Sequence, residues 1–172
     1  MIIVEKKYEN GIKLTYEPEG NTHSGFSLKF IPTEPDQKFD ADIAKSILKL
    51  LIGYYPNCTI TAEIKNQFEF VDCGSNFEKV RCNHCDKNLE MDYWLELMNK
   101  AYETKFQDLK FETKCCQNLS NLNDLNYHFE CGFAKSIFQV EDPEYDETII
   151  KKLLSKLEET ANIDFKVIRS KY

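Results

Sequence analysis

The amino-acid sequence predicts an α+β fold in which two strand–helix–strand units flank a cysteine-bearing insertion. Alternating apolar residues precede and follow a helical apolar pattern over residues 26–64, and the same plan recurs over residues 136–167. The middle of the chain carries paired cysteines and does not follow this plan. Two such units in 172 residues fit a ferredoxin-like layer, in which helices cover one face of a mainly antiparallel sheet.

We expect four parts within one compact domain. Residues 1–20 form an added N-terminal hairpin, residues 21–65 the first βαβ arm, residues 66–131 the insertion, and residues 132–172 the second βαβ arm. The added hairpin is predicted by the dipeptide Asn10-Gly11, which lies between two short apolar-rich runs and is a strong hairpin signal.

The first arm begins with a strand over residues 26–31, where apolar and polar residues alternate. Asp40 can cap the helix that follows, and Gly53 and Pro56 end it. The apolar residues of this helix recur every three or four positions: Ile43, Ile47, Leu50, Leu51 and Tyr54. Residues 58–64 alternate again and predict the second strand of the arm.

The second arm repeats this plan. Residues 136–140 predict a strand, and Asp142-Pro143 ends it. Asp146 can cap a helix, whose apolar stripe is Ile149, Ile150, Leu153, Leu154 and Leu157. Ile163, Phe165 and Val167 indicate the final strand.

Within the insertion, residues 77–81 lead into the first cysteine pair, and residues 109–113 form a strand that leads into the second. Between them lies a helix with the predicted apolar stripe Met91, Trp94, Leu95, Met98 and Tyr102. The Asn-rich segment 118–126 is expected to be an ordered loop.

The two cysteine pairs predict one zinc site. Cys82-x2-Cys85 at the end of a strand is typical of a zinc knuckle, and Cys115-Cys116 ends another strand. Zn²⁺ prefers four such ligands in a tetrahedron. Adjacent cysteines in an extended strand point to opposite faces, so both can bind only if the chain turns, which Gln117-Asn118 allows. Four cysteines leave no open position, so we expect a structural zinc in a zinc-ribbon-like segment.

Other ligand sets and roles remain open. If Cys116 points away, Cys73, Cys131, His84 or His128 are the substitutes, and a site of three cysteines and water is an alternative. A redox Cys-x2-Cys is less well supported, because the motif is followed by Asp86-Lys87-Asn88 rather than by a helix.

The order of these motifs resembles a group of uncharacterised bacterial proteins with paired CxxC and CC zinc-knuckle motifs. Their pattern is matched by residues 72–78 (DCGSNFE), Cys82-Asn-His-Cys85, Tyr93-Trp94, Cys115-Cys116 and residues 121–127 (NLNDLNY). The resemblance covers residues 26–172. Asn83 stands in place of the family's Pro, and Asp86 and Gln117 in place of its Gly, which makes both turns less ideal. The resemblance implies an intracellular zinc-binding protein and supplies no biochemical activity.

The resemblance also singles out five polar residues that would meet near the metal if their two loops meet. They form either a small recognition patch or a set of turn-capping side chains: Asp72, Asn76, Asn123, Asp124 and Tyr127. The sequence favours a protein-interaction module over an enzyme. An enzyme would have to use Asp72, Glu78 or Asp124 as acid or base beside the metal, because other catalytic motifs are missing.

Composition limits the partners further. The formal net charge is −7, which argues against nucleic acid, because nucleic-acid binding depends on Lys and Arg, and is compatible with a basic protein partner. The longest apolar run, residues 47–55, contains Lys49 and Gly53 and is far shorter than a membrane span of about 20 residues. The N-terminal MIIVEKKYEN has the wrong order for a signal peptide, so we expect a cytoplasmic location and reduced cysteines.

Overall fold

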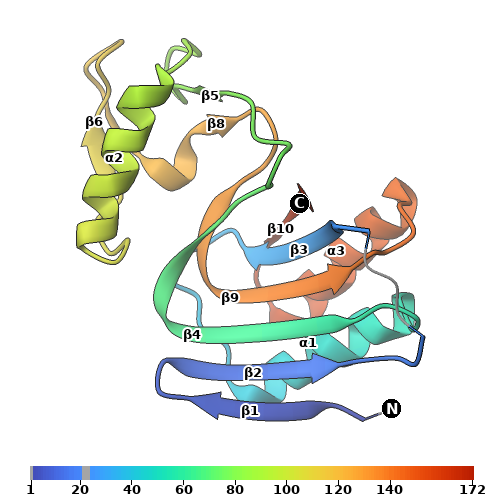
Figure 1. Cartoon of the computed structure of the whole chain (residues 1–172). Coiled ribbons are helices and arrows are strands. Elements are labelled where there is room, and N and C mark those ends of the chain that lie inside the picture. Colours follow the sequence, from blue (N-terminus) through green and yellow to red (C-terminus); the bar gives the residue numbers. More distant parts are fainter. Residues whose placement is uncertain (1, 21–23) are drawn as a thin grey trace.

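The computed structural model describes residues 2–20 and 24–172. It has an α+β fold built on a six-stranded sheet with the strand order β1-β2-β4-β9-β3-β10 (Figure 1). All neighbouring strands in this sheet are antiparallel. Its strands are β1 (Val4–Tyr8), β2 (Gly11–Tyr16), β3 (Phe26–Pro32), β4 (Ile60–Val71), β9 (Gly132–Glu141) and β10 (Phe165–Lys171).

Two helices connect these strands and cover one face of the sheet. Helix α1 (Ala41–Tyr54) runs between β3 and β4, and α3 (Glu147–Ala161) runs between β9 and β10 (Figure 1). Both predicted N-caps are confirmed: Asp40 accepts hydrogen bonds from the backbone N–H of Asp42 and Ile43, and Asp146 does the same at the start of α3. The large core between sheet and helices includes Phe30, Ile47, Ile60, Phe138 and Leu153, all fully buried.

The predicted N-terminal hairpin is present, but its turn is shifted by one residue. Glu9 and Asn10 form the turn, and Gly11 already pairs with Tyr8 as the first residue of β2. Gly11 has φ +149°, and a Cβ atom there would lie 2.0 Å from the carbonyl oxygen of Ile64. The glycine is therefore required by the close approach of β4 rather than by the turn itself.

Strands β4 and β9 are longer than the sequence pattern predicts and run beyond the sheet toward the insertion. Their register shifts between Ile64 and Glu69, and pairing then resumes as far as Val71 opposite Gly132. An irregularity of this kind bends a strand. Figure 1 shows both strands curving toward the part of the molecule that contains α2. The insertion is thus attached at two neighbouring strand ends.

The insertion, residues 72–131 between these strand ends, contains one helix and two small two-stranded sheets. Helix α2 (Met91–Glu103) packs beside them, β5 (Val80–Arg81) pairs with β8 (Asn126–Tyr127), and β6 (Lys110–Glu112) pairs with β7 (Leu119–Asn121). A short 3₁₀ helix, η1 (Leu122–Asp124), lies between β7 and β8. The segment expected to be one Asn-rich loop therefore contains a strand and a helical turn.

The predicted apolar stripe of α2 is wrong in part. Trp94 is buried, but Met91, Leu95 and Tyr102 are 38, 45 and 69% exposed. The face that packs inward is formed by the buried Trp94 and Ala101, together with the partly buried Leu97 and Met98. The helix carries two apolar stripes, and spacing alone does not tell which one meets the core.

Among the helices of residues 2–20 and 24–172, none combines the length and the apolar character that crossing a membrane requires.

Candidate metal centre

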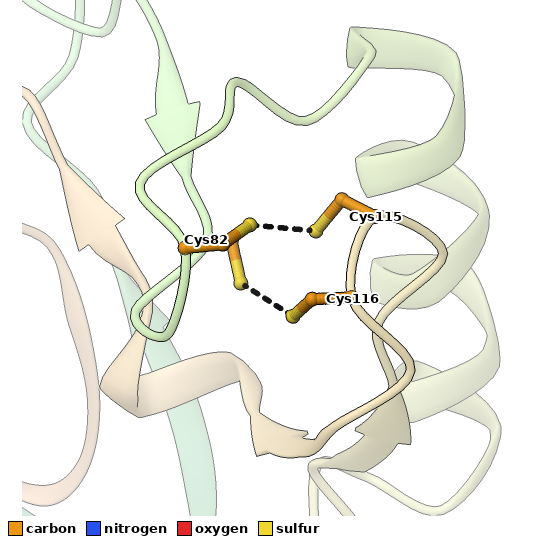
Figure 2. Close-up of side chains that lie close together, drawn as sticks. Cys82, Cys115 and Cys116 are labelled. Atoms are coloured by element: carbon orange, nitrogen blue, oxygen red, sulfur yellow. Dashed lines mark hydrogen bonds between the residues drawn. The ribbon is translucent and has the colours of Figure 1, made fainter.

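The four predicted cysteine ligands meet at one point. The Sγ atoms of Cys82, Cys85, Cys115 and Cys116 all lie within 4.8 Å of one another. Cys82 and Cys116 are 3.8 Å apart, and Cys85 and Cys115 are 3.4 Å apart, sulfur to sulfur. Figure 2 shows the labelled sulfur atoms of Cys82, Cys115 and Cys116 directed inward from two facing loops. Sulfur atoms around a tetrahedral Zn²⁺ lie about 3.8 Å apart, given Zn–S bonds of about 2.3 Å, so the cluster is compatible with zinc.

The first loop is a tight turn that follows β5. The backbone N–H of Asp86 donates to the carbonyl of Cys82 at 3.0 Å, and the N–H of Cys82 donates to the carbonyl of Lys87 at 2.9 Å. The N–H of His84 points at the sulfur of Cys82 at 3.4 Å. This N–H group lies where it stabilises negative charge on the sulfur.

The second loop has the same backbone pattern. The N–H of Gln117 donates to the carbonyl of Thr113, and the N–H of Thr113 donates to the carbonyl of Asn118, both at 2.9 Å. Thr113 therefore occupies the place that Cys82 has in the first loop, and Cys116 occupies the place of Cys85. Cys115, one residue earlier, supplies the sulfur that Thr113 lacks. Both adjacent cysteines reach the cluster because they lie in a turn and not in a strand.

Both turns contain a residue in the left-handed region at the same position. Asp86 has φ 59° and Gln117 has φ 57°. A side chain in this region costs about 1–2 kcal/mol, which glycine avoids. Asp86 offsets part of this cost through an ion pair with Arg81 at 2.8 Å.

Thr113 and Asn118 were not predicted as site residues, yet both contact the cluster. The Thr113 hydroxyl lies 3.1 Å from the sulfur of Cys116, and the Asn118 side-chain amide donates to the same sulfur at 3.3 Å. Aligning TKCCQ with CNHCD would have identified Thr113 as the counterpart of the first cysteine.

The surroundings of the cluster shift the pKa values of its thiols in opposite directions. Hydrogen bonds from Thr113 and Asn118 lower the pKa of Cys116 to about 6. Burial and the neighbouring sulfur atoms raise the pKa of Cys115 to about 12. Closely spaced thiolates repel one another, so the thiols ionise together only when a cation compensates their charge.

The substitute ligands lie elsewhere. Cys73 and Cys131 form a separate buried pair with their sulfur atoms 3.4 Å apart. The ring of His84 contacts the backbone carbonyl of Leu119 at 2.8 Å. His128 lies 3.4 Å from the carboxylate of Glu78 and is half exposed, not packed in the core. Among the described residues, the cluster of possible metal ligands contains only Cys82, Cys85, Cys115 and Cys116.

Four of the five side chains of the predicted recognition patch form hydrogen bonds with backbone groups of different segments, and Asp72 also bonds to a side chain. Asp72 accepts from the N–H of Gly74 and the hydroxyl of Tyr172, and Asn76 donates to the carbonyl of Arg169 in β10. Asn123 accepts from the N–H of Phe133, and the Tyr127 hydroxyl donates to the carbonyl of Leu122. Asp124 is exposed. These bonds fix the loops around the insertion, and the recognition role stays a prediction.

A scan against protein-family models, a search of curated proteins and a search of solved structures found no match to this chain.

Proposed function

We propose that the four cysteines bind one zinc ion and that this zinc is structural. The observation that carries the proposal is the convergence of four Sγ atoms within 4.8 Å from two turns of matching backbone geometry. A tetrahedral set of four thiolates suits zinc or iron, and two short knuckles of this kind are typical of zinc. With all four positions taken by cysteine, the ion has no site for water or substrate.

The place of the cluster in the fold explains what the ion contributes. It joins the turn after β5 to the turn between β6 and β7, which are otherwise held by short strands of two or three residues. The core of the insertion is small and depends on Trp94, Val80, Leu122 and Leu125. A metal cross-link compensates for a core of this size, because metal binding adds directly to folding free energy.

We further propose that the sheet with α1 and α3 is ferredoxin-like and that the insertion, residues 72–131 between β4 and β9, is zinc-ribbon-like. The antiparallel order β10-β3-β9-β4, with one helix after β3 and one after β9, supports the first part. The two facing cysteine turns support the second. The hairpin β1-β2 adds two strands beside β4.

The proposed role is a protein-interaction module whose contact surface is α2. Met91, Leu95 and Tyr102 lie on one exposed stripe of this helix, because their spacing is four and seven residues. Asp92, Glu96 and Glu103 are exposed beside this stripe. An apolar stripe with acidic residues at its side favours a basic protein with apolar side chains, which agrees with the net charge of −7.

The alternative as an enzyme has less support. Glu78 lies beside His128 on the surface, and Asp72 is held by Gly74 and Tyr172. The carboxylates with a shifted pKa include Glu5, Glu63 and Glu147, whose pKa values are all lowered. A general acid beside a metal would need the opposite shift.

The metal proposal is tested by measuring the metal content of purified protein by mass spectrometry, with thermal unfolding before and after chelation. We expect about one zinc per chain and a lower melting temperature after chelation. Protein that contains no metal, or iron in place of zinc, would contradict the proposal.

The interaction role is tested by cross-linking in extracts with wild-type protein, Leu95→Glu and, as a matched surface control, Tyr145→Glu. A partner that is lost with Leu95→Glu and kept with Tyr145→Glu supports α2 as the contact surface. Equal capture by both variants would contradict it.

A further inference from the structure

The outer edge of β1 is a sheet edge that no other described strand covers. β1 is the last strand in the order of the sheet, and all five of its residues are exposed. Figure 1 shows β1 at the lower edge of the sheet: β2 lies along its upper side, and no strand lies below it. An exposed edge of this kind offers unpaired backbone N–H and C=O groups to another strand.

The pairing of the hairpin determines which backbone groups face outward. Tyr8 pairs with Gly11 across a two-residue turn, so Tyr8, Lys6 and Val4 exchange hydrogen bonds with β2. The N–H of Asn66 donates to the carbonyl of Asn10, so the backbone groups of the even-numbered residues here are directed toward β4. The odd-numbered residues of β2 are therefore left to bond with β1, which agrees with the pairing of Tyr8 and Gly11. The outward N–H and C=O groups of β1 therefore belong to Glu5 and Lys7.

The side chains of β1 alternate between the two faces of the sheet. Glu5 forms an ion pair with Lys45 of α1 at 2.7 Å, so Glu5 and Lys7 lie on the helix-covered face. Val4, Lys6 and Tyr8 lie on the opposite face, where Val4 is 50% and Tyr8 57% exposed. The edge thus combines unpaired backbone with exposed apolar side chains.

We propose that β1 pairs antiparallel with β1 of a second copy of this chain, around a two-fold axis at Lys6. Such pairing has to bring outward backbone groups together. If Glu5 lies opposite the partner subunit's Glu5, or Lys7 opposite the partner subunit's Lys7, like charges face each other. If the axis passes through Lys6, Glu5 lies opposite the partner subunit's Lys7, and Lys7 opposite the partner subunit's Glu5.

The same register also matches the apolar side chains. Val4 lies opposite the partner subunit's Tyr8 on the exposed face, in a closely spaced pair without hydrogen bonds between the two residues. Its unfavourable contact is Lys6 opposite the partner subunit's Lys6. Lysines on an edge strand normally disfavour pairing with another strand. In β1, Lys7 disfavours the register in which it would lie opposite the partner subunit's Lys7. The dimer is a specific one and does not extend, because the two-fold contact uses the only free edge of β1.

Sedimentation velocity over a concentration series up to about 1 mM tests the proposal. We expect wild-type protein to shift from monomer to dimer. Glu5→Lys places Lys opposite Lys, and Lys7→Glu places Glu opposite Glu, so each variant alone should dimerise roughly tenfold more weakly. An equimolar mixture of the two variants restores both ion pairs and should dimerise like wild type, as should the double variant with both changes.

The matched control is Glu144→Lys, which makes the same change in net charge at an exposed residue outside the sheet. It should leave dimerisation unchanged. The proposal is overturned if wild-type protein stays monomeric, if a larger assembly forms, or if mixing Glu5→Lys with Lys7→Glu restores nothing. Circular dichroism of each variant distinguishes loss of pairing from loss of folding. None of these results depends on the zinc or on the contact surface at α2.

Discussion

The sheet unit and the cysteine-bearing insertion are stabilised in different ways. The sheet with α1 and α3 encloses a continuous core of fully buried large side chains, among them Phe30, Ile47 and Phe138. The insertion buries far fewer, and the exposed side chains of its helix include Met91, Leu95 and Tyr102. Apolar burial therefore stabilises the sheet unit, whereas we propose that the stability of the insertion depends on a metal ion held by the four cysteines.

The largest expected effect comes from removing the cross-link. Cys85→Ser, or chelation of wild-type protein, should unfold the insertion and leave the sheet folded, because the sheet core contains none of the four cysteines. Hydrogen exchange measured by mass spectrometry should show rapid exchange in residues 80–125 and continued protection in β3, β4, β9 and β10. Loss of protection in both regions would mean that the two are not separable. Cys58→Ser, outside the cluster, is the control.

The reciprocal change is Phe138→Ala in the sheet core. Phe138 is fully buried and contacts Phe39 and Phe165. We expect a loss of about 3–5 kcal/mol in the free energy of unfolding, because a large cavity is left in a packed core. Chemical denaturation followed by the far-ultraviolet circular dichroism signal measures it, because the single tryptophan, Trp94, lies in the insertion and not in this core. A loss below about 1 kcal/mol would show that this core is looser than its packing indicates.

A smaller, stabilising effect is expected in the metal turns. Gln117→Gly removes the side chain from a residue at φ 57° and should raise stability by about 0.5–1 kcal/mol, since glycine adopts this region without strain. The gain should appear in the melting temperature of the zinc-loaded protein and in its resistance to chelation. Lys87→Gly is the control, since Lys87 is an exposed residue at the matching place of the first turn and is not among the residues with positive φ. Reduced stability of Gln117→Gly would contradict the strain argument.

The smallest effect concerns the pH dependence of the sheet. Burial raises the pKa of Glu63, but the ion pairs with Lys65 at 2.8 Å and Lys13 at 3.0 Å outweigh it, so the pKa is lowered. A lowered pKa in the folded state gives stability that is present at neutral pH and is lost as the pH falls through that value. Glu63→Gln should cost at most about 1 kcal/mol at pH 7 and nothing in acid. Urea unfolding at both pH values measures this, and a constant difference would contradict the ion-pair account.

The sequence predicts the sheet unit better than the insertion, and particular residues show why. Asp40 and Asp146 cap helices that each carry one continuous apolar stripe. The cap and the stripe therefore predict the same helix. In α2, Trp94 and Leu95 belong to different faces, and no local pattern says which face is buried. Strand β6 lies within the strand predicted over residues 109–113, but β7 has only three residues, which is too short for a period of two to appear, and lies in the segment expected to be a loop.

The convergence of the four cysteines was predictable because two closely spaced cysteine pairs, each at the end of a predicted strand, are typical of metal-ligating turns. The sequence did not predict how the two adjacent cysteines, Cys115 and Cys116, both direct their sulfur atoms to the same point. The solution depends on the left-handed backbone of Gln117 and on Thr113 in the position of a missing cysteine. Neither residue type is diagnostic of a metal turn by itself.

The attachment of the insertion at Val71 and Gly132 has a consequence for how such a chain can change over time. These residues are paired neighbours on β4 and β9, so the whole insertion replaces what would otherwise be a short hairpin loop. Deleting, exchanging or enlarging it requires no rearrangement of strand order. A lineage that keeps the scaffold can therefore exchange the insertion between one descendant and the next, provided that the contacts of residues 72–76 with β10 and the C-terminus are kept or replaced.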